Sequence, residues 1–461
     1  KKSSSTVIRV GLIGGGPCGL ALLNAFNKVP GDCDVKVVCF EKQSKVGGLW
    51  NYDWRTGTDS NGLAMHSSMY RHLWSNGPKE CLEMCDYTFD QHFKGKNIGS
   101  FPPRPVLADY ILGRVKANEL EKKFDVRLNH HVVNVQHNEQ TNKFTVQYEN
   151  VAEGKPGSET FDYVVVATGH FSTPNIPEFK GFDSFNGRIL HAHSFRNAQE
   201  FKGQNILVIG SSYSAEDISL QCLKFGCKNV TVSYRTSPMG FKWPAGVKEV
   251  PLLKEMVNGK DAVFADGQTV ENIDSIILCT GYLHSFPFLA DELRLKTGNI
   301  LYPRSLYKGV VWMDKPNLMY LGMQDQWYTF SMFDLQALYA RDVIMGKVKL
   351  PDKEAMNKDT EQWARRGGES VGWKKAIRFQ SDYLFDLYGS LADGKEYVDS
   401  KEKLDYTEEF YQWEHDKHTD ICTYRDQRFK SRVTGKLSAR FTVPWMTAFD
   451  DSIECFLQKS E

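Results

Sequence analysis

Short apolar runs recur along the chain and alternate with longer segments of mixed polarity. The first run, residues 7–13, is followed at once by a glycine, and residues 20–26 then read as the start of a helix. A run of this length that stops at a glycine predicts a buried strand and a strand-to-helix turn. Repetition of this unit predicts an α/β protein built on parallel sheets.

The first turn carries glycines at the spacing G-x-G-x-x-G, namely Gly14, Gly16 and Gly19. This spacing permits a tight turn, close approach of a pyrophosphate to the backbone, and close packing of helix on strand. The next apolar run, residues 35–40, leads to Glu41, which stands 22 positions after Gly19. An acidic side chain there accepts hydrogen bonds from an adenosine ribose, so the pattern predicts a dinucleotide site.

A second glycine pair follows closely, because Gly47 and Gly48 stand only a few residues after Glu41. It indicates that the backbone stays close to a large cofactor beyond the ribose, which is more typical of FAD than of NAD. We therefore expect Gly48, Leu49 and Trp50 to contact the cofactor.

A second strand-to-helix turn begins where the apolar run 206–209 meets Gly210. Ser212 stands where the middle glycine is expected, and Ala215 occupies the position of close helix packing. Three interpretations are open at this point. The turn is a damaged nucleotide site, an ordinary strand-to-helix connection, or a nucleotide site that uses a side chain.

The strand expected at residues 230–234 ends at Arg235 and Thr236. An NAD site would place an acid here, whereas a cation suits the 2′-phosphate of NADP. Two nucleotide turns on one chain, an acid after the first and a base after the second, indicate FAD together with NADPH.

The apolar runs 163–167 and 276–279 each lead into a Thr-Gly pair, and together they bracket the second turn. They predict two Rossmann-like dinucleotide-binding domains, with the NADP-binding domain, residues 173–281, inserted into the FAD-binding domain. The FAD-binding domain would then comprise residues 1–172 and residues 282–461, the latter with a C-terminal helical segment. Each crossing would connect the two domains beside a cleft.

Four residues between the two sites match F-x-G-x-x-x-H-x-x-x-[YF], namely Phe185, Gly187, His191 and Phe195. With the two turns, this pattern makes the chain resemble the flavin-containing monooxygenases. Runs such as "SSMYRHLWSNGPKECLE" and "GSSYSAEDI" are similar to the bacterial trimethylamine-oxidising branch of that family. The resemblance implies NADPH- and O₂-dependent oxygenation of small tertiary amines, such as trimethylamine to its N-oxide, through a C4a-hydroperoxyflavin.

The resemblance also implies roles for individual residues. Asn76 would lie beside the flavin, where its amide donates a hydrogen bond without adding a proton acceptor. Tyr213 would contact the nicotinamide end of NADP or gate the substrate pocket. Ser211, Ser212 and Ser214 would donate hydrogen bonds to phosphate or ribose, so that the serine in the second turn is a variant and not a lesion.

A late segment, "GMQDQWYTF", is expected to meet the flavin ring. Gln324 or Gln326 would bond the ring edge, and Asp325 would accept from NADP or orient a neighbour. Trp327 and Trp413 would wall the substrate pocket, to which Asp325 is also expected to belong. Because the amine reacts through its lone pair, we expect apolar walls and few carboxylates.

Composition removes several other classes of protein. Lys plus Arg and Asp plus Glu both total 57, which gives no reason to expect a nucleic-acid or membrane partner. No apolar run approaches the roughly 20 residues of a membrane span, and the N-terminal residues show no secretory signal. The ten cysteines include no C-x-x-C pair, as expected of a cytoplasmic protein with reduced thiols. The family form implies a homodimer.

Alternative functions remain within and outside the family. The same chemistry would oxygenate small sulfides, and a weak Baeyer–Villiger activity on ketones is a further alternative, although Phe195 replaces the tryptophan typical of those enzymes. A thioredoxin-reductase-like enzyme needs the missing cysteine pair. A flavin-bound redox sensor is the non-enzymatic alternative, which turnover of free NADPH would separate. We expect no metal site at His191 and His193, and the segment 360–405 departs from the family pattern.

Overall fold

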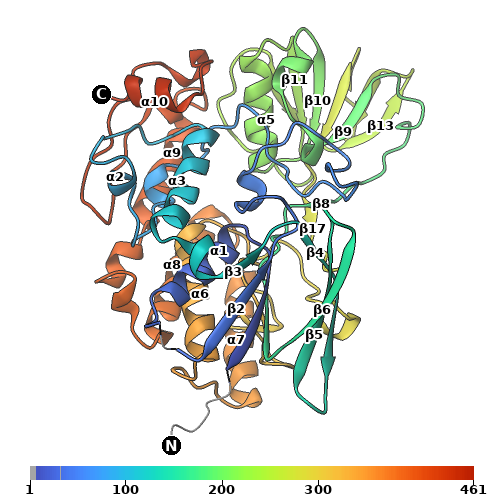
Figure 1. Ribbon diagram of the computed structural model, residues 1–461. Coiled ribbons are helices and arrows are strands. Elements are labelled where there is room, and N and C mark those ends of the chain that lie inside the picture. The colour runs from blue at the N-terminus through green and yellow to red at the C-terminus, as the bar shows by residue number, and fades with distance from the viewer. Residues whose placement is uncertain (1–6, 32) are drawn as a thin grey trace, which may run out of the picture.

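The computed structural model describes residues 7–31 and 33–461. Residues 1–6, part of the stretch in which no secretory signal is expected, lie outside the described residues. The chain forms a large lower lobe and a smaller upper lobe, the latter built around helix α5 and strands β9, β10 and β11 (Figure 1).

A seven-stranded sheet organises the lower lobe. Its inner strands are parallel and almost entirely buried, because both of its faces are covered. The antiparallel strands β18 and β19 form one edge. In spatial order the strands are β18 (Leu306–Tyr307), β19 (Val311–Trp312), β20 (Leu318–Tyr320), β7 (Tyr163–Val166), β1 (Ile8–Ile13), β2 (Val35–Phe40) and β3 (Asp125–Arg127).

The two faces of this sheet belong to two hydrophobic cores. Alternate residues of β2 divide between them, with Val37 and Cys39 in one core and Val38 and Phe40 in the other. Helices α1 (Pro17–Asn27) and α6 (Phe330–Ile344) cover the first face. An antiparallel sheet covers the second face, with strands β4 (His130–Asn138), β5 (Lys143–Asn150) and β6 (Lys155–Phe161).

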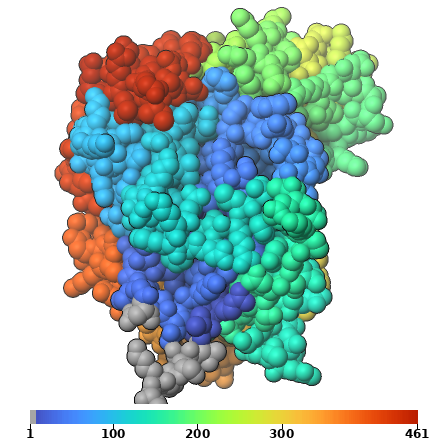
Figure 2. All heavy atoms as spheres, viewed as in Figure 1, coloured from blue at the N-terminus to red at the C-terminus, as the bar shows by residue number. Residues whose placement is uncertain are grey.

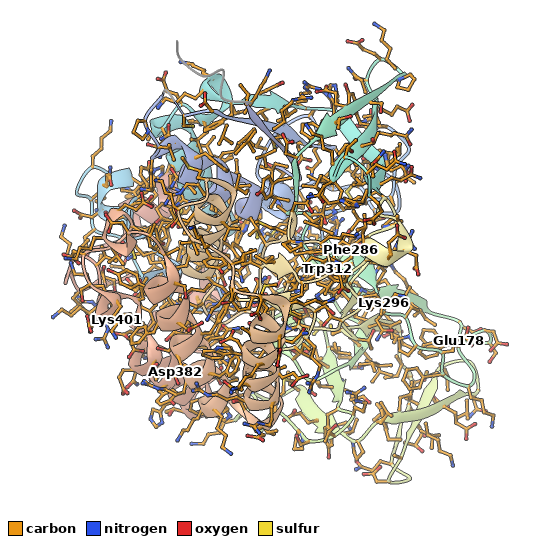
Figure 3. All side chains as sticks on the ribbon, turned by 90° about the horizontal axis from the view of Figure 1, so that it is seen from below. Glu178, Phe286, Lys296, Trp312, Asp382 and Lys401 are labelled. Atoms are coloured by element: carbon orange, nitrogen blue, oxygen red, sulfur yellow. The ribbon has the colours of Figure 1, made fainter. Side chains whose placement is uncertain are left out.

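The second core also holds the antiparallel edge of the large sheet. Phe286 and Trp312 lie close together there (Figure 3), and both rings pack against Tyr320, at centroid distances of 5.2 and 5.9 Å. The same core includes Phe40 and Phe161 from the first half of the chain, so segments far apart in sequence share one domain core.

A second, five-stranded parallel sheet forms the upper lobe, and α5 (Tyr213–Lys224) packs on it. Its strands are β12 (Val247–Val250), β11 (Asn229–Ser233), β10 (Asn205–Ile209), β16 (Ser275–Leu278) and β9 (Arg188–His191). A small antiparallel sheet adjoins it, with strands β13 (Leu253–Val257), β14 (Asp261–Phe264) and β15 (Thr269–Val270).

The two chain crossings between the lobes pair with each other as strands β8 (Thr173–Pro174) and β17 (Tyr282–Leu283). The sheet strands between them in sequence all lie outside the seven-stranded sheet, as an inserted domain requires. The predicted α/β class with parallel sheets is confirmed, whereas the domain boundaries themselves stay a prediction.

The remaining helices lie mainly on the left side of the molecule in Figure 1, where the C-terminal segment adjoins the upper lobe (Figure 2). None of the helices in the described ranges combines the length and apolar character that a membrane span needs. The helices not yet named are α2 (Phe89–His92), α3 (Arg104–Ala117), α4 (Leu120–Lys123), α7 (Lys353–Glu369), α8 (Trp373–Ser390), α9 (Thr407–Thr419) and α10 (Ile453–Lys459).

Candidate active site

The first glycine turn joins β1 to α1 and packs tightly against neighbouring backbone. Gly14 has φ +106°, and a Cβ there would lie 2.5 Å from the carbonyl oxygen of Ala167. A Cβ on Gly16 would lie 3.4 Å from the Cα of Gly48. Gly16 also leaves the start of α1 without a side-chain cap. The turn therefore fits a pyrophosphate held by backbone N–H groups at a helix N-terminus.

Glu41 follows β2 at the same sheet edge and is only 5% exposed. Its two carboxylate oxygens accept hydrogen bonds from the N–H groups of Gly15 and Gln43, both at 2.7 Å. Burial raises the pKa of Glu41, and these hydrogen bonds act in the opposite direction. A carboxylate fixed in this way retains further lone pairs, and its binding of a ribose stays a prediction.

The second glycine pair lies directly against the first turn. The Gly47 N–H donates to the Gly15 carbonyl oxygen at 2.9 Å, and the short 3₁₀ helix Gly48–Trp50 follows. Leu49 and Trp50 are half-buried, with the Trp50 ring 6.4 Å from that of Phe330. This backbone approach agrees with a cofactor that extends past the first turn.

The second turn joins β10 to α5 and begins in the same way as the first. Gly210 has φ +134°, and a Cβ there would lie 2.1 Å from the Cys279 carbonyl oxygen. Ser212 caps α5 by position but makes no side-chain cap hydrogen bond. Ser211, Ser212 and Ser214 are all exposed. Their hydroxyl groups are therefore open to a ligand at the helix N-terminus.

Arg235 and Thr236 follow the neighbouring strand, β11, and both side chains are exposed. The last residue of β11, Ser233, accepts a hydrogen bond from the Gly210 N–H at 2.9 Å. The predicted NADP-reading pair thus stands beside the second turn.

A cavity of about 80 Å³ lies where the two lobes meet. Its described lining side chains include no carboxylate, ammonium or guanidinium group. The lining residues are Asn76, Gly77, Pro78, Cys81, Leu82, Tyr213, Gln326, Trp327, Thr329, Phe410 and Trp413. Four predicted residues, Asn76, Tyr213, Trp327 and Trp413, therefore converge from distant parts of the chain.

Aromatic rings form one wall of this cavity. Tyr213, the first residue of α5, stacks on Trp413 of α9 with a centroid distance of 6.0 Å and an interplanar angle of 16°. Trp327 meets Tyr213 edge to face at 5.8 Å and lies 6.0 Å from Trp413. Burial, followed by the nearby Glu414 carboxylate, raises the pKa of Tyr213, which keeps its hydroxyl protonated.

Asn76 also lines the cavity and lies in a loop that buried hydrogen bonds hold in place. The Ser75 N–H donates to the Pro102 carbonyl oxygen at 2.8 Å, and Arg425 Nε donates to the Ser75 carbonyl oxygen at 3.0 Å. The same guanidinium pairs with Asp217 of α5 at 2.6 Å. Arg425 therefore ties the Asn76 loop to the helix that presents Tyr213.

The prediction for Gln324 is wrong in its placement. Gln324 is fully buried, and its amide donates to the Tyr383 hydroxyl at 3.1 Å and accepts from Gln336 at 3.0 Å. With both ends used inside the core, this side chain does not reach the cavity. Gln326, the alternative weighed from the sequence, lines it instead.

Asp325 is also absent from the cavity wall predicted for it. Its carboxylate accepts from Asn299 Nδ2 at 3.1 Å and from the Gln326 N–H at 3.0 Å. Burial raises the pKa of Asp325. The geometry makes it an anchor for the loop that carries Gln326 and Trp327.

Several functional residues were not singled out from the sequence. Phe410 lines the cavity and stands one helical turn before Trp413, a spacing that could have identified it. Gln380 of α8 accepts from the N–H groups of Trp327 and Tyr328, at 2.8 and 3.0 Å, and donates to the Asp325 carbonyl oxygen. It lies in the segment that departs from the family pattern and carries no sequence signal of its own.

The side chains of His191, Lys79 and Glu80 all have partners within the protein, which indicates structural roles. His191 Nε2 donates to the Gly281 carbonyl oxygen at 3.0 Å, and Nδ1 accepts from the His193 N–H at 3.0 Å. Burial lowers the pKa of His191 to about 4. Lys79 and Glu80 are buried and pair at 2.6 Å, away from the cavity lining.

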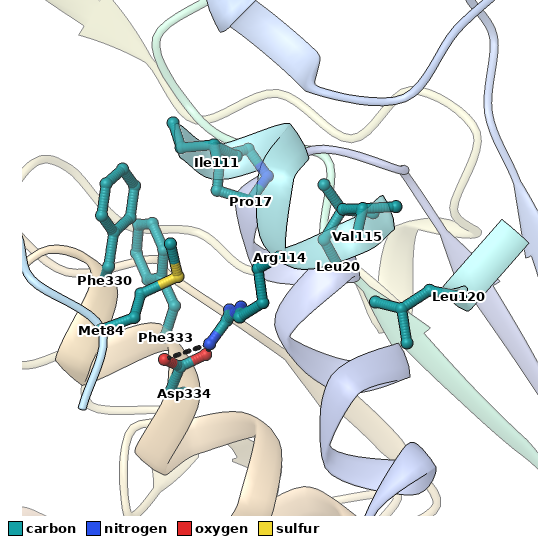
Figure 4. A pocket seen from close by; sticks show the side chains of 10 residues that line it. All are labelled: Pro17, Leu20, Met84, Ile111, Arg114, Val115, Leu120, Phe330, Phe333 and Asp334. Atoms are coloured by element: carbon teal, nitrogen blue, oxygen red, sulfur yellow. Dashed lines mark hydrogen bonds and ion pairs between the residues drawn. The ribbon is translucent and has the colours of Figure 1, made fainter. Parts of the chain in front are cut away.

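A second cavity, of about 10 Å³, lies near the start of α1 and is too small for a substrate (Figure 4). Arg114 and Asp334 form a bidentate ion pair beside it, with both distances 2.8 Å. Pro17, Phe330 and Phe333 are among its apolar lining residues. This pair holds α3 against α6 beneath the first turn.

Two nucleotide-type turns and an aromatic cavity between the lobes define an enzyme that binds two dinucleotides on one chain. The family model "Flavin-binding monooxygenase-like" matches residues 7–240 and 245–405, and the chain belongs to this family. Family membership confirms the predicted enzyme class and the two cofactors, FAD and NADPH.

Individual relatives are similar over almost the whole chain. Trimethylamine monooxygenase of Pelagibacter sp. (strain HTCC7211) is 51% identical over 456 residues, which cover 98% of this chain and 99% of that protein. The crystal structure of Tmm from the same strain has a TM-score of 0.92 and covers 97% of this chain and 100% of that chain. S-allyl-L-cysteine S-oxygenase from Allium sativum is 28% identical, with a TM-score of 0.75 and coverage of 91% and 95%.

Proposed function

We propose that this enzyme uses NADPH and O₂ to convert trimethylamine to trimethylamine N-oxide. The observation that carries the proposal is the cavity of about 80 Å³ with aromatic walls and no ionic group among its described lining residues. The relatives at about half identity, which bear the name trimethylamine monooxygenase, support the same substrate.

The chemistry of the wall suits an uncharged methylated amine. Tyr213, Trp327 and Trp413 offer dispersion contacts to methyl groups, and the absence of a carboxylate from the described lining avoids fixing the amine as its protonated form. The protonated amine has no free lone pair and cannot accept oxygen. A largely apolar cavity wall also limits the access of water to the reacting centre.

FAD, held at the first turn, would supply the redox chemistry that links NADPH to O₂. Asn76 holds the oxygen to be transferred through a hydrogen bond from its neutral side-chain amide, which accepts no proton in return. Tyr213 closes the cavity at the start of α5 and orients the nicotinamide end of NADP there.

The cofactor contacts form part of the same proposal. The residues proposed to hold FAD are Gly14, Gly16, Gly19, Glu41, Gly48, Leu49, Trp50 and Gln326. The residues proposed to hold NADP are Gly210, Ser211, Ser212, Ser214, Arg235 and Thr236. A cytoplasmic homodimer completes the proposal, supported by the family resemblance and testable by sedimentation and cell fractionation.

The test is mass-spectrometric detection of trimethylamine N-oxide from FAD-loaded protein with NADPH and trimethylamine in air. Stoichiometric N-oxide per NADPH is expected, with mixtures lacking protein or lacking NADPH as controls. NADPH oxidation that yields only H₂O₂ would overturn trimethylamine as the substrate.

Oxygenation of small sulfides is a second candidate. The described cavity wall is uncharged, and a sulfide lone pair is available at every pH. Dimethyl sulfide in place of trimethylamine, with the sulfoxide as product, tests this candidate in the same assay.

A further inference from the structure

A buried cation lies directly behind the aromatic wall. Lys417 of α9 is 1% exposed and stands one helical turn after Trp413. Its ammonium nitrogen is 4.3 Å from the centroid of the Trp413 ring and 4.9 Å from that of Tyr213. Lys417 itself is not among the lining residues of the cavity. The two rings therefore lie between the Lys417 ammonium group and the substrate space.

Two carboxylates hold this cation in place. Lys417 Nζ lies 3.1 Å from Glu216 Oε2 on α5 and 3.0 Å from Glu414 Oε1 on α9. Both carboxylates are buried, and the pair of Arg425 with Asp217 lies beside them. A buried charge is costly unless it is paired, so this arrangement fixes the ammonium relative to both rings.

A wall of electron-rich rings has an intrinsic preference for cations. The faces of Tyr213 and Trp413 would attract the trimethylammonium ion, which dominates over the free amine at neutral pH. This ion has no lone pair and would occupy the cavity without reacting. The Lys417 ammonium already occupies the π-electron faces of these two rings and competes with a second cation for them, while the paired carboxylates of Glu216 and Glu414 offset its longer-range charge.

We propose that Lys417 sets the charge selectivity of the substrate cavity, by occupying the π-electron faces of Tyr213 and Trp413 and disfavouring cationic ligands relative to neutral ones. It acts as a positioning and selectivity residue, since it reaches the substrate only through the two rings. The inference rests on the proposed function, because it explains how the cavity favours the reactive, neutral amine.

A purely structural role for Lys417 has a different signature. If the lysine only braced the wall, its loss would weaken neutral and cationic ligands by similar factors. A selectivity role changes the ratio of the two affinities and leaves the neutral ligand nearly unaffected.

The experiment measures that ratio with two ligands of similar shape that are not oxygenated, tetramethylammonium and tert-butanol. Binding to the protein loaded with FAD and NADP⁺ is followed by quenching of tryptophan fluorescence. Lys417→Met should raise the affinity for tetramethylammonium relative to tert-butanol by about tenfold. Lys417→Arg, which keeps the charge, should stay within about twofold of the unmodified protein.

Glu414→Gln provides a second, independent test, because it removes a negative charge from the same cluster and leaves the lysine. It should lower the relative affinity for tetramethylammonium by about threefold. If Lys417→Met fails to fold, Lys417→Gln takes its place in the same comparison. Unchanged ratios, or equal weakening of both ligands, would overturn the inference.

Failure of the proposed function remains distinguishable. Absence of N-oxide from the unmodified enzyme would overturn trimethylamine oxygenation, whereas the binding ratio would still report on Lys417. Normal N-oxide formation with an unchanged ratio would overturn only the role of Lys417.

Discussion

The two glycine turns of this protein begin alike and end differently. Gly14 and Gly210 both have positive φ angles. A Cβ on either would lie within 2.5 Å of the carbonyl oxygen of the residue that directly follows the neighbouring strand, Ala167 after β7 or Cys279 after β16. Each turn is therefore pressed against the segment that leaves its own sheet. This shared contact is the part of the fingerprint that the fold requires.

The difference lies one step further along the chain. A Cβ on Gly16 would lie 3.4 Å from the Cα of Gly48, so a chain segment covers the middle position of the first turn. In the second turn, Ser212 at this position is exposed. The first helix then starts with Pro17 and the second with Tyr213, whose ring forms part of the cavity wall. A missing middle glycine here accompanies an open turn whose helix start supplies a side chain to the cavity wall.

The largest expected effect comes from breaking the shared contact. Gly14→Ala and Gly210→Ala should each destabilise the protein by at least about 3 kcal/mol, because the Cβ meets backbone and the φ angle is strained. Denaturant unfolding and soluble yield measure the effect. Gly298→Ala, at an exposed site with no neighbour within 4 Å, is the matched control and should change little. Equal stability of all three variants would contradict the comparison.

The next effect concerns Asn76, which lines the cavity together with Tyr213 of the second turn. Asn76→Ala should still be reduced by NADPH but form N-oxide about 100-fold more slowly, because a hydrogen bond to the transferred oxygen is lost. Single-turnover reduction and product yield are measured on the same sample. A yield like that of the unmodified enzyme would remove Asn76 from the proposed mechanism.

The third prediction compares Arg235, which follows the second turn, with Glu41, which follows the first. Arg235→Ala should raise the KM for NADPH by about 10- to 150-fold, the loss of one charge-assisted hydrogen bond, and should leave the KM for NADH unchanged. Glu41 occupies the corresponding position after the first turn, so FAD binding should be unaffected by this substitution. Lys242→Ala, an exposed cation nearby in sequence, is the control. An unchanged preference for NADPH would show that Arg235 does not read the 2′-phosphate.

The elements with strong local signals were predictable from the sequence. The strands at residues 7–13 and 163–167 were expected within one residue of β1 and β7, because buried apolar runs that stop at glycine have few other structures open to them. The convergence of four cavity residues could be predicted because the family resemblance assigned them to one site. These residues are Asn76, Tyr213, Trp327 and Trp413. Spacing alone would not have joined residues so far apart.

The failures have a physical reason. Gln324 and Gln326 stand two positions apart in a loop, where no periodicity tells which side chain faces the cavity and which enters the core. Tertiary contacts make the choice. Tyr383 and Gln336 form hydrogen bonds with the side-chain amide of Gln324. Gln380 accepts a hydrogen bond from the backbone N–H of Trp327, further along the same loop. Such contacts come from α6 and α8 and leave no local pattern in the sequence.

The smallest expected effect tests the variant position itself. Ser212→Gly restores the usual glycine and removes one neutral hydroxyl donor, so the KM for NADPH should rise about 2- to 10-fold with the free energy of unfolding nearly unchanged. Ser212 is exposed and makes no cap hydrogen bond within the protein, so any effect reports on the bound cofactor. Steady-state kinetics with NADPH, at a fixed and saturating amine concentration, measure it. An unchanged KM would mean that backbone N–H groups alone bind the phosphate at both turns, and that the serine is merely tolerated where no chain segment covers it.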